Sequence, residues 1–228
     1  MPPCFSPMFE RSLQLLKVEF AAPSETAAEA RDRLRDRFPR QAVRRMTHLG
    51  LLLGSALEGV ALMAEDAVVY ASRFAETRAL EDYLASFPTP SPLLFQTSIH
   101  PGGVQQVLIG RQQSVSRLWP VAGGARLIEQ ALLAALLETA PRVVLVGGEE
   151  RGTWLGEYGL ASAEAFAFAA VLTRDVAGGS GRVVFRPGTA DCGAPEPAPE
   201  LPAFARALRD GAPQGWRGAA GEWEVTVL

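Results

Sequence analysis

Short apolar runs alternate along the chain with longer stretches in which apolar residues recur every three or four positions. The short runs are rich in β-branched and aromatic residues, which is typical of strands. They predict strands at 13–21, 66–72, 114–119, 142–150, 166–172 and 182–186. The longer stretches have the period of an amphipathic helix. They predict helices at 24–38, 41–63, 76–87, 97–110 and 125–139.

The order of these elements predicts an α/β fold. Strands that alternate with helices build a mostly parallel sheet, here of five strands, with helices on both faces. The Gly-rich segment 175–181 predicts a turn that joins the last two strands into an antiparallel edge hairpin. A tight turn is expected at 120–124, and Ser24 is the expected N-cap of the first helix.

The predicted helix at 125–139 is apolar on every side from Ala131 to Leu137. A helix on the outer face of an ordinary three-layer sandwich would carry a polar stripe. We therefore expect a second layer to cover this helix, either from the same chain or from another one.

The composition changes after Pro187, which divides the chain into a domain at 1–187 and a tail at 188–228. The tail opens with the Pro-rich linker 194–202. A short helix at 203–209 and a terminal edge strand at 222–228 are expected to follow.

Composition and charge exclude several classes of function. A net charge of −3 and a pI near 5.5 argue against a general nucleic-acid binder. The apolar runs are too short for a membrane span, and the N-terminus lacks the pattern of a signal peptide, so a cytoplasmic protein is expected. The cysteines, Cys4 and Cys192, do not have the spacing of a metal site, so neither a metal nor another cofactor is expected.

Familiar catalytic motifs are absent from the sequence. The dinucleotide fingerprint is missing, and a P-loop is excluded because Lys17 is the only lysine. The segment GGSG at 178–181 has the wrong spacing for a nucleophile elbow and is interpreted as a turn. His48 is interpreted as a packed histidine. His100 is interpreted as structural, with a role as a base beside Ser98 as the alternative.

Seven arginines and two aspartates lie between Arg31 and Arg45. One interpretation is a solvated helix face in which opposite charges pair along the helix. The other is a docking patch for an acidic partner. The sequence leaves both open.

Five segments, taken in order, resemble β-ketoacyl synthases. They are QAVRRMTHLGLLLGSALEG, AVVYAS with ETRALEDYL, PLLFQTSIHPGGVQQVLIG, SVSRLWPVAGGARLIEQALLAAL and RVVLVGGEE, which together cover roughly 41–174. In the same order, they resemble five parts of the β-ketoacyl synthase fold. These are the first long helix, the second strand and helix, the loop and helix at the dimer interface, the nucleophile turn with its buried helix, and the strand that follows. The resemblance implies the N-terminal half of a thiolase-like fold, in which the helix after the nucleophile is buried between two sheets.

The resemblance also implies an inactive condensing site. Val121 aligns with the nucleophilic cysteine, and a valine cannot form a thioester. No histidine follows His100, so the family's two catalytic histidines have no equivalent. An acyl or partner pocket is expected around this position. Its expected lining is Phe95, Trp119, Val121 and Arg126.

The sequence is identified as a member of the ketosynthase-like N-terminal domain family, which resembles the chain-length factors of polyketide pathways. This implies a non-catalytic partner of a ketosynthase or an acyl carrier protein in polyketide or fatty-acid (aryl-polyene-like) biosynthesis. Because carrier proteins are acidic, Arg40, Arg44 and Arg45 are the expected docking residues. The alternatives are a small acyl-thioester hydrolase or acyltransferase that uses Ser98 and His100, and a scaffold without a ligand.

The resemblance further implies association with another chain, as a homodimer or as a heterodimer with a ketosynthase. The expected interface residues are Phe95, His100, Gln105, Ile109 and Val115. In the other interpretation, the tail folds back over the open face of the helix at 125–139. The covering side chains would then be Phe204, Leu208, Trp216 and Trp223.

Overall fold

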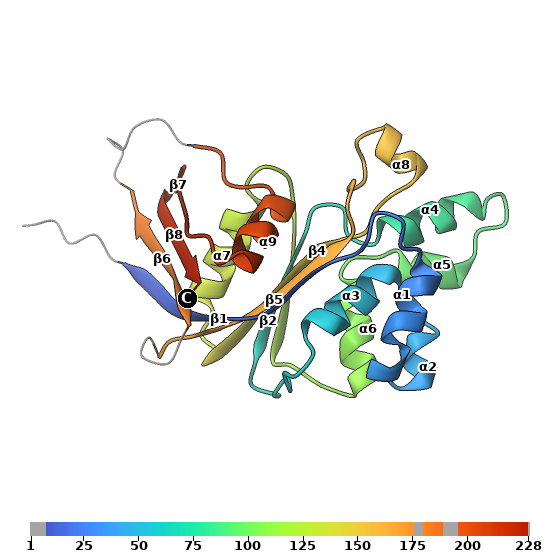
Figure 1. The fold of residues 1–228 in the computed structure, drawn as a ribbon, viewed down its shortest axis with the longest axis horizontal. Helices are drawn as coiled ribbons and strands as arrows, with labels where there is room; N and C mark the ends of the chain where they lie inside the picture. The colour runs from blue at the N-terminus through green and yellow to red at the C-terminus, as the bar shows by residue number, and fades with distance from the viewer. Residues whose placement is uncertain (1–7, 176–179, 189–195, 228) are drawn as a thin grey trace, which may run out of the picture.

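The structure is a computed structural model that describes residues 8–175, 180–188 and 196–227. Within these ranges the strands form one eight-stranded sheet in the order β3-β2-β4-β5-β1-β6-β8-β7 (Figure 1). The strands are β1 (Phe9–Phe20), β2 (Ala67–Ser72), β3 (Arg117–Ala122), β4 (Arg142–Glu149), β5 (Phe166–Thr173), β6 (Gly181–Pro187), β7 (Gln214–Gly218) and β8 (Gly221–Val227). The α-helices are α1 (Ala27–Leu34), α2 (Arg40–Val43), α3 (His48–Ala56), α4 (Thr77–Ala85), α5 (Pro92–Thr97), α6 (Gly102–Arg111), α7 (Leu127–Leu137), α8 (Trp154–Glu157) and α9 (Leu201–Arg209), and η1 (Arg35–Arg37) is a 3₁₀-helix.

The prediction of a five-stranded, mostly parallel sheet was wrong. Parallel pairing is confined to β3-β2-β4, and β5, β1, β6, β8 and β7 are added to β4 in antiparallel pairs. Crossover helices join β2, β3 and β4, as parallel pairing requires. The connection from β4 to β5 contains only the short α8, so the chain returns antiparallel.

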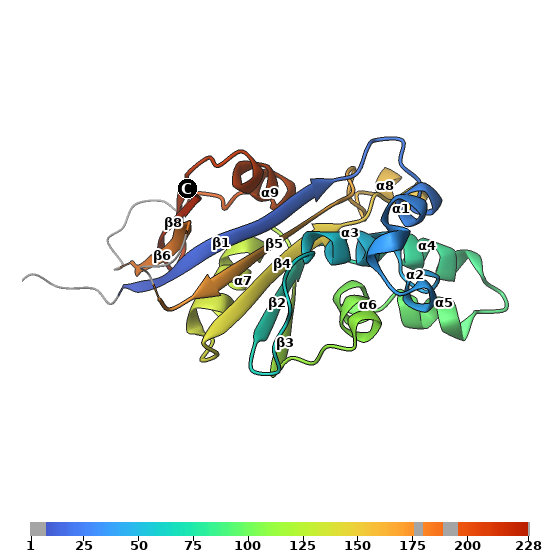
Figure 2. The same cartoon turned by 60° about the horizontal axis from the view of Figure 1, so that its bottom comes forward.

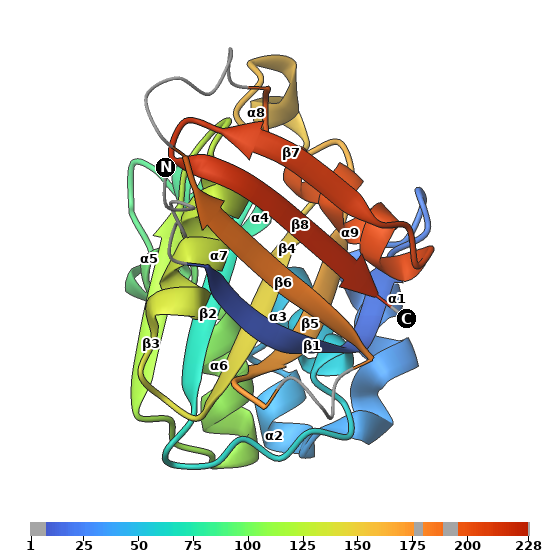
Figure 3. The ribbon, with the colours of Figure 1, turned by 90° about the vertical axis from the view of Figure 1, so that its left-hand side faces the viewer.

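The predicted hairpin between the last two strands before the tail was also wrong. The 12-residue β1 lies between β5 and β6, with Phe20 opposite Phe166 and Phe9 opposite Phe185. Residues 176–179, which include most of the predicted turn and part of the GGSG segment, lie outside the described residues. An antiparallel edge hairpin does exist, but β8 and β7 form it. The strand expected at the edge, β8, is therefore internal, and β7 takes the edge (Figure 3).

The two faces of the sheet carry two apolar cores, as the expectation of helices on both faces requires. Val69 of β2 faces α7 and α9, whereas its neighbour Tyr70 faces the core that contains α1, α3 and α6. Figures 1 and 2 show α7 and α9 on one side of the sheet and α3 and α6 on the other. The strands β2, β4 and β5 are buried over nearly their whole length, which explains their continuous apolar sequences.

The C-terminal elements cover the apolar helix α7. Phe204 and Leu208 of α9, Trp216 of β7 and Trp223 of β8 are buried in the same core as Leu132. A ladder of stacked rings crosses four strands, from Phe9 through Phe185 and Trp223 to Trp216. Burial is not complete around the helix, because Gln130 is exposed and the Leu137 side chain is 56% exposed.

Three expected helices have different bounds in the structure. The helix expected at 41–63 breaks into α2 and α3, because Thr47 caps a new start by accepting a hydrogen bond from the Gly50 N–H. The helix expected at 97–110 is replaced by α5 and α6, which meet near His100–Pro101. The first helix begins after Thr26 rather than Ser24, because Thr26 and Glu29 form a capping box.

The segment around Pro120 was expected to be a turn but belongs to β3. A proline cannot donate a ladder hydrogen bond, and it is tolerated here because β3 is at the edge of the sheet. The turn before α7 is therefore shorter than predicted.

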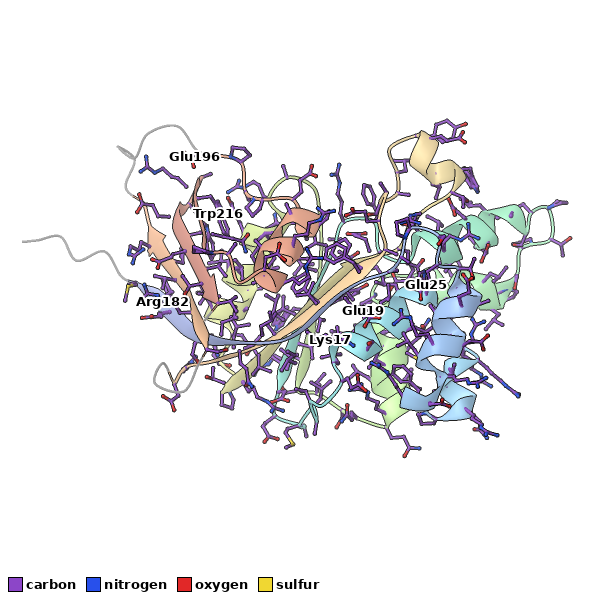
Figure 4. The ribbon with its side chains drawn as sticks, in the orientation of Figure 1. Lys17, Glu19, Glu25, Arg182, Glu196 and Trp216 are labelled. Carbon is purple, nitrogen blue, oxygen red and sulfur yellow. The ribbon has the colours of Figure 1, made fainter. Side chains whose placement is uncertain are left out.

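Polar side chains tie β1 to the helices that cover it. Lys17 Nζ lies 3.0 Å from a Glu19 carboxylate oxygen and donates to Ser55 Oγ over 2.7 Å. Arg33 of α1 bridges Glu19 and Glu25. Figure 4 labels Lys17 and Glu19 on β1 and Glu25 in the segment between β1 and α1. Among the described residues, no helix has the length and hydropathy needed to cross a membrane.

Candidate functional site: the nucleophile position, an open sheet edge and an arginine–glutamine groove

The position expected from the sequence to correspond to a ketosynthase nucleophile lies on the edge strand β3. Val121 is the penultimate residue of β3, opposite Ala71, and it packs against the core that contains α7. The N-cap residue of α7 is Arg126, whose guanidinium Nε lies 3.2 Å from Glu129 Oε2. From Arg117 to Leu127 the sequence holds no cysteine, serine, threonine or histidine. This segment therefore has no side chain that could form an acyl-enzyme by the ketosynthase route.

The predicted pocket residues lie on different elements. Trp119 lines a cavity of about 260 Å³ with neighbours from β3 and the end of α7, and none of the other three predicted residues lines that cavity. The Trp119 indole donates a 2.6 Å hydrogen bond to Glu138 Oε2. Phe95 lies on α5, where its ring contacts Tyr83 at a centroid distance of 5.3 Å. The structure therefore does not gather the four residues around one cavity.

Glu138 holds the end of α7 to β3. Its carboxylate accepts hydrogen bonds from the Thr139 and Ala140 N–H groups and from Arg117 as well as from Trp119. Burial alone would raise the pKa of Glu138, but these partners lower it to about 2. This ionised carboxylate is therefore structural, and sequence reasoning did not identify it.

The described residues contain no hydrogen bond between Ser98 and His100. Ser98 Oγ donates to the Phe95 carbonyl over 2.8 Å, and the His100 ring packs at a tilt against Tyr70 with a centroid distance of 4.7 Å. His100 Nδ1 lies 3.8 Å from Glu76 Oε2. His48 is buried beside Glu25, and burial lowers its pKa. Both histidines are thus packed within the fold.

Three buried glutamates at the ends of β2 and β4 were missed by the sequence analysis. Glu76 accepts from the Gly103 N–H at the start of α6, and Glu149 accepts from the Arg73 and Phe74 N–H groups. Glu150 accepts from Leu49 and Arg78, near the starts of α3 and α4. Helix N-termini favour negative groups, so Glu76 and Glu150 fill helix ends themselves, whereas Glu149 binds backbone N–H groups in the segment after β2. The two consecutive glutamates at the end of a buried strand were the available signal.

Burial raises the pKa of Glu149 to about 7, against the hydrogen bonds from Arg73 and Phe74. Burial likewise raises the pKa of Glu150 to about 7, against those from Leu49 and Arg78. Both carboxyls therefore change protonation near neutral pH. Glu150 holds the starts of α3 and α4 together, and Glu149 holds the segment between β2 and α4.

A groove of about 960 Å³ brings together residues that the sequence analysis had assigned to two separate roles. Arg44 and Arg45, expected to dock a carrier protein, line it from the segment after α2. Gln105 and Ile109, expected at a dimer interface, line it from α6. The full lining is Pro39, Gln41, Ala42, Arg44, Arg45, Met46, Leu93, Gln96, Thr97, Gly102, Gln105, Gln106, Ile109, Gly110, Arg111, Gln112 and Gln113.

Local contacts fix the walls of this groove. The Gln106 carboxamide oxygen accepts a 2.8 Å hydrogen bond from the Thr47 N–H, which ties α6 to the start of α3. Arg111 donates to the Gly54 and Leu57 carbonyls at the end of α3, and burial lowers its pKa. Gly110 lets α6 approach α2 closely, because a β-carbon there would lie 3.0 Å from that of Ala42.

The face beside the groove exposes apolar side chains. Leu93 is 65% exposed, Phe95 50% and Ile109 77%. The adjacent strand β3 pairs only with β2 among the described strands, so its other edge is open. Of the expected interface residues, Phe95, Gln105 and Ile109 are exposed, whereas His100 and Val115 are partly buried.

Comparison with known proteins identifies the architecture. No family model matches the chain. A search of curated proteins found no match either. Among solved structures, a ketosynthase in complex with its chain length factor from Xenorhabdus doucetiae (ApeO and ApeC) matches with a TM-score of 0.63 and 19% identity. That match covers 94% of this chain and 99% of the other. The protein has a ketosynthase-like, thiolase-type fold.

Two further solved structures support the same fold. The ishigamide ketosynthase/chain length factor matches with a TM-score of 0.55 and 15% identity, over 79% of this chain and 68% of that one. A β-ketoacyl synthase from Burkholderia phymatum matches with a TM-score of 0.53 and 12% identity, over 90% and 69%. At these identities the likeness concerns the fold alone.

Proposed function

We propose that this protein is a non-catalytic, chain-length-factor-type partner of a ketosynthase in polyketide or fatty-acid biosynthesis. The proposal is supported by the ketosynthase-like fold together with the segment from Arg117 to Leu127, which holds no cysteine, serine, threonine or histidine around Val121, the expected nucleophile position. The solved neighbours include ketosynthases paired with chain length factors.

The pairing surface would consist of the open edge of β3 and the exposed face of α5 and α6. An unpaired strand edge offers backbone donors and acceptors to a second chain. Exposed apolar side chains such as Phe95 and Ile109 mark protein interfaces when they lie together on one face. A heterodimer would thus bury the groups that this chain leaves open.

The same proposal assigns carrier-protein docking to Arg40, Arg44 and Arg45. All three are exposed, and none forms an ion pair within the described part of the chain. Unpaired arginines attract an acidic partner from a distance, and salt weakens that attraction.

The test is co-expression with a ketosynthase from the same organism. We expect a heterodimer by light scattering, and condensing activity that requires both chains. The double variant Phe95→Asp with Ile99→Asp should lower the affinity at least tenfold, because it places charges on an apolar interface. The matched control Tyr158→Asp with Leu160→Asp changes exposed apolar residues outside this face and should leave pairing unchanged. Equal loss in both variants, or no complex with any ketosynthase of the organism, would contradict the proposal.

A further inference from the structure

Arginine and glutamine supply nearly all of the polar side chains that line the groove between α2, α5 and α6. It contains three arginines and six glutamines but neither aspartate nor glutamate. This is notable because the whole chain carries a net charge of −3. A cavity of about 960 Å³ is at the upper end of the range that accommodates ligands. The selection of side chains therefore favours an anionic ligand with many hydrogen-bonding groups.

The composition of the lining also excludes other ligand classes. Metal ions in proteins are generally held by at least one carboxylate, imidazole or thiolate ligand, and no such group lines the groove. Nucleotides and single-stranded nucleic acids are generally held by aromatic stacking, and no lining residue is aromatic. A glutamine side chain both donates and accepts hydrogen bonds, as the amide group of a polypeptide backbone does.

We propose that this groove binds an extended, acidic segment of a partner polypeptide. Arg44 and Arg45 would pair with its carboxylates, and the exposed amides of Gln41, Gln96 and Gln105 would bond its backbone. Exposed Leu93 and Ile109 offer apolar contact at the same site. The inference extends the proposed function, because it names the chemistry that the docking arginines recognise.

The lining residues differ in how free they are to bind a ligand. Arg111 and Gln106 are committed to α3, through the Gly54 and Leu57 carbonyls and the Thr47 N–H. Arg44 and Arg45 have no ion pair within the described residues and are exposed. Test substitutions therefore use these two arginines and the exposed glutamines, and leave the structural pair intact.

The first experiment measures binding of fluorescein-labelled hexaglutamate to the isolated full chain by fluorescence polarisation at low salt. We expect saturable binding that Arg44→Glu with Arg45→Glu weakens at least tenfold. The control variant Arg35→Glu with Arg209→Glu makes the same change of charge outside the groove. It should weaken binding of the peptide less than twofold. Absence of binding, or equal losses in the two double variants, would overturn the proposal.

The second experiment tests pairing with the peptide backbone. Hexaglutamate with alternate backbone nitrogens methylated keeps every carboxylate but loses half of its N–H donors. It should bind the natural protein about fivefold more weakly than plain hexaglutamate. Gln41→Ala with Gln105→Ala should remove most of that difference. Two results would overturn the proposal by showing that the groove binds anions in general. One is that the natural protein binds the plain and the methylated peptide with equal affinity. The other is that it binds hexathymidylate as tightly as it binds plain hexaglutamate.

Neither experiment needs a ketosynthase, and neither Phe95 nor Ile99 lines the groove. Loss of ketosynthase pairing in the Phe95→Asp, Ile99→Asp variant with retained peptide binding would separate the two surfaces. Failure of peptide binding with intact ketosynthase pairing would reject the groove inference alone.

Discussion

At the scale of single residues, buried carboxyl groups dominate the end of the sheet where β2 and β4 finish. Glu149 is 2% exposed and Glu150 is fully buried, and each accepts hydrogen bonds from two backbone N–H groups. Within the described ion pairs, neither contacts a cation within 4 Å. Burial therefore outweighs the hydrogen bonds, and both groups take up protons more readily in the folded protein than in an unfolded chain.

We predict that the free energy of unfolding falls as the pH rises through 7. Each group has a pKa of about 7 in the folded state and 4.5 as the reference for an unfolded chain. A raised folded-state pKa gives stability that is fully present below about pH 4.5 and is lost as the pH rises through 7. One such shift corresponds to about 3 kcal/mol. Chemical denaturation at pH 5.5 and pH 8.5 should therefore differ by about 3 kcal/mol or more.

Single variants show which carboxyl group causes the change of stability with pH. Glu149→Gln and Glu150→Gln should each reduce the difference between pH 5.5 and pH 8.5 by about half, whatever they do to stability at pH 5.5. Glu157→Gln, at an exposed position on α8, should leave the slope unchanged. A protein that is equally stable at both pH values would show that the buried pair is ionised throughout.

Glu138 affects stability at acidic pH instead. Its pKa of about 2 in the folded protein lies below the ordinary value of 4.5, so the stability that it contributes is lost only as the pH falls below about 4.5.

Val121 leads to a prediction about chemistry. Incubation with an acyl thioester should leave no stoichiometric acyl group on residues 114–130, because this segment holds no cysteine and its Ser114 and Ser116 precede the nucleophile position. Intact-mass spectrometry with peptide mapping measures this, and Cys4→Ser with Cys192→Ser removes the background of free thiols. Val121→Cys should not restore condensation, since no histidine follows His100. A mapped adduct at 114–130 in the natural sequence would refute the proposed inactivity.

At the scale of elements, α7 shows how far burial follows from sequence. Its all-apolar stretch predicted a helix covered on both sides, and the structure buries Leu132 and Leu136 between the sheet and α9. We predict that Leu132→Ala and Leu136→Ala each lower the free energy of unfolding by about 2–5 kcal/mol. Leu137→Ala, at a side chain that is 56% exposed, should cost less than about 1 kcal/mol. Denaturant titration of the three variants compares them, and equal small losses would place α7 on the surface.

Elements with strong local patterns were predictable, and their partners were not. The continuous apolar runs of β2, β4 and β5 indicated buried strands near their observed positions. The place of β1 between β5 and β6 depends on pairs such as Phe20 with Phe166, which are more than 140 residues apart in sequence. No local pattern encodes such a choice, and the expectation of a mostly parallel sheet came only from the alternation of strands with helices.

The candidate site shows the same limit. Arg44 and Ile109 were both singled out from the sequence, but for different roles. They line one groove because α6 crosses α3 and contacts α2, an arrangement fixed by long-range contacts such as Gln106 with Thr47. The sequence supplied the residue types, and tertiary packing decided which of them lie together.

At the scale of the whole molecule, the apolar face of α7 has a cover within the chain. Strands from 1–187 and from 188–228 share one sheet, and α9 packs on α7. The division of the chain at 187 remains a prediction. On α5 and α6, Leu93, Phe95 and Ile109 are exposed, and the outer edge of β3 is unpaired among the described strands, so we propose that association with another chain uses that surface.

The last prediction concerns a chain that ends at Pro187. It would lose α9, β7 and β8, and with them a set of buried apolar side chains that includes Phe204, Leu208, Trp216 and Trp223. Burying a large apolar side chain contributes about 1.5–3 kcal/mol, and a folded domain is stable by only about 5–15 kcal/mol. We expect the shortened chain to aggregate or unfold, as judged by light scattering and circular dichroism.

A full-length variant keeps this prediction testable even if the shortened chain cannot be purified. Phe204→Ala should cost about 3–5 kcal/mol if α9 covers the core, whereas Arg209→Ala, at an exposed position on the same helix, should cost less than about 0.5 kcal/mol. A shortened chain that stays folded and forms the same stable dimer as the full chain would contradict the covering role of the C-terminal elements. That outcome would assign the cover of α7 to a second chain, as in the ketosynthase-like dimer expected from the sequence.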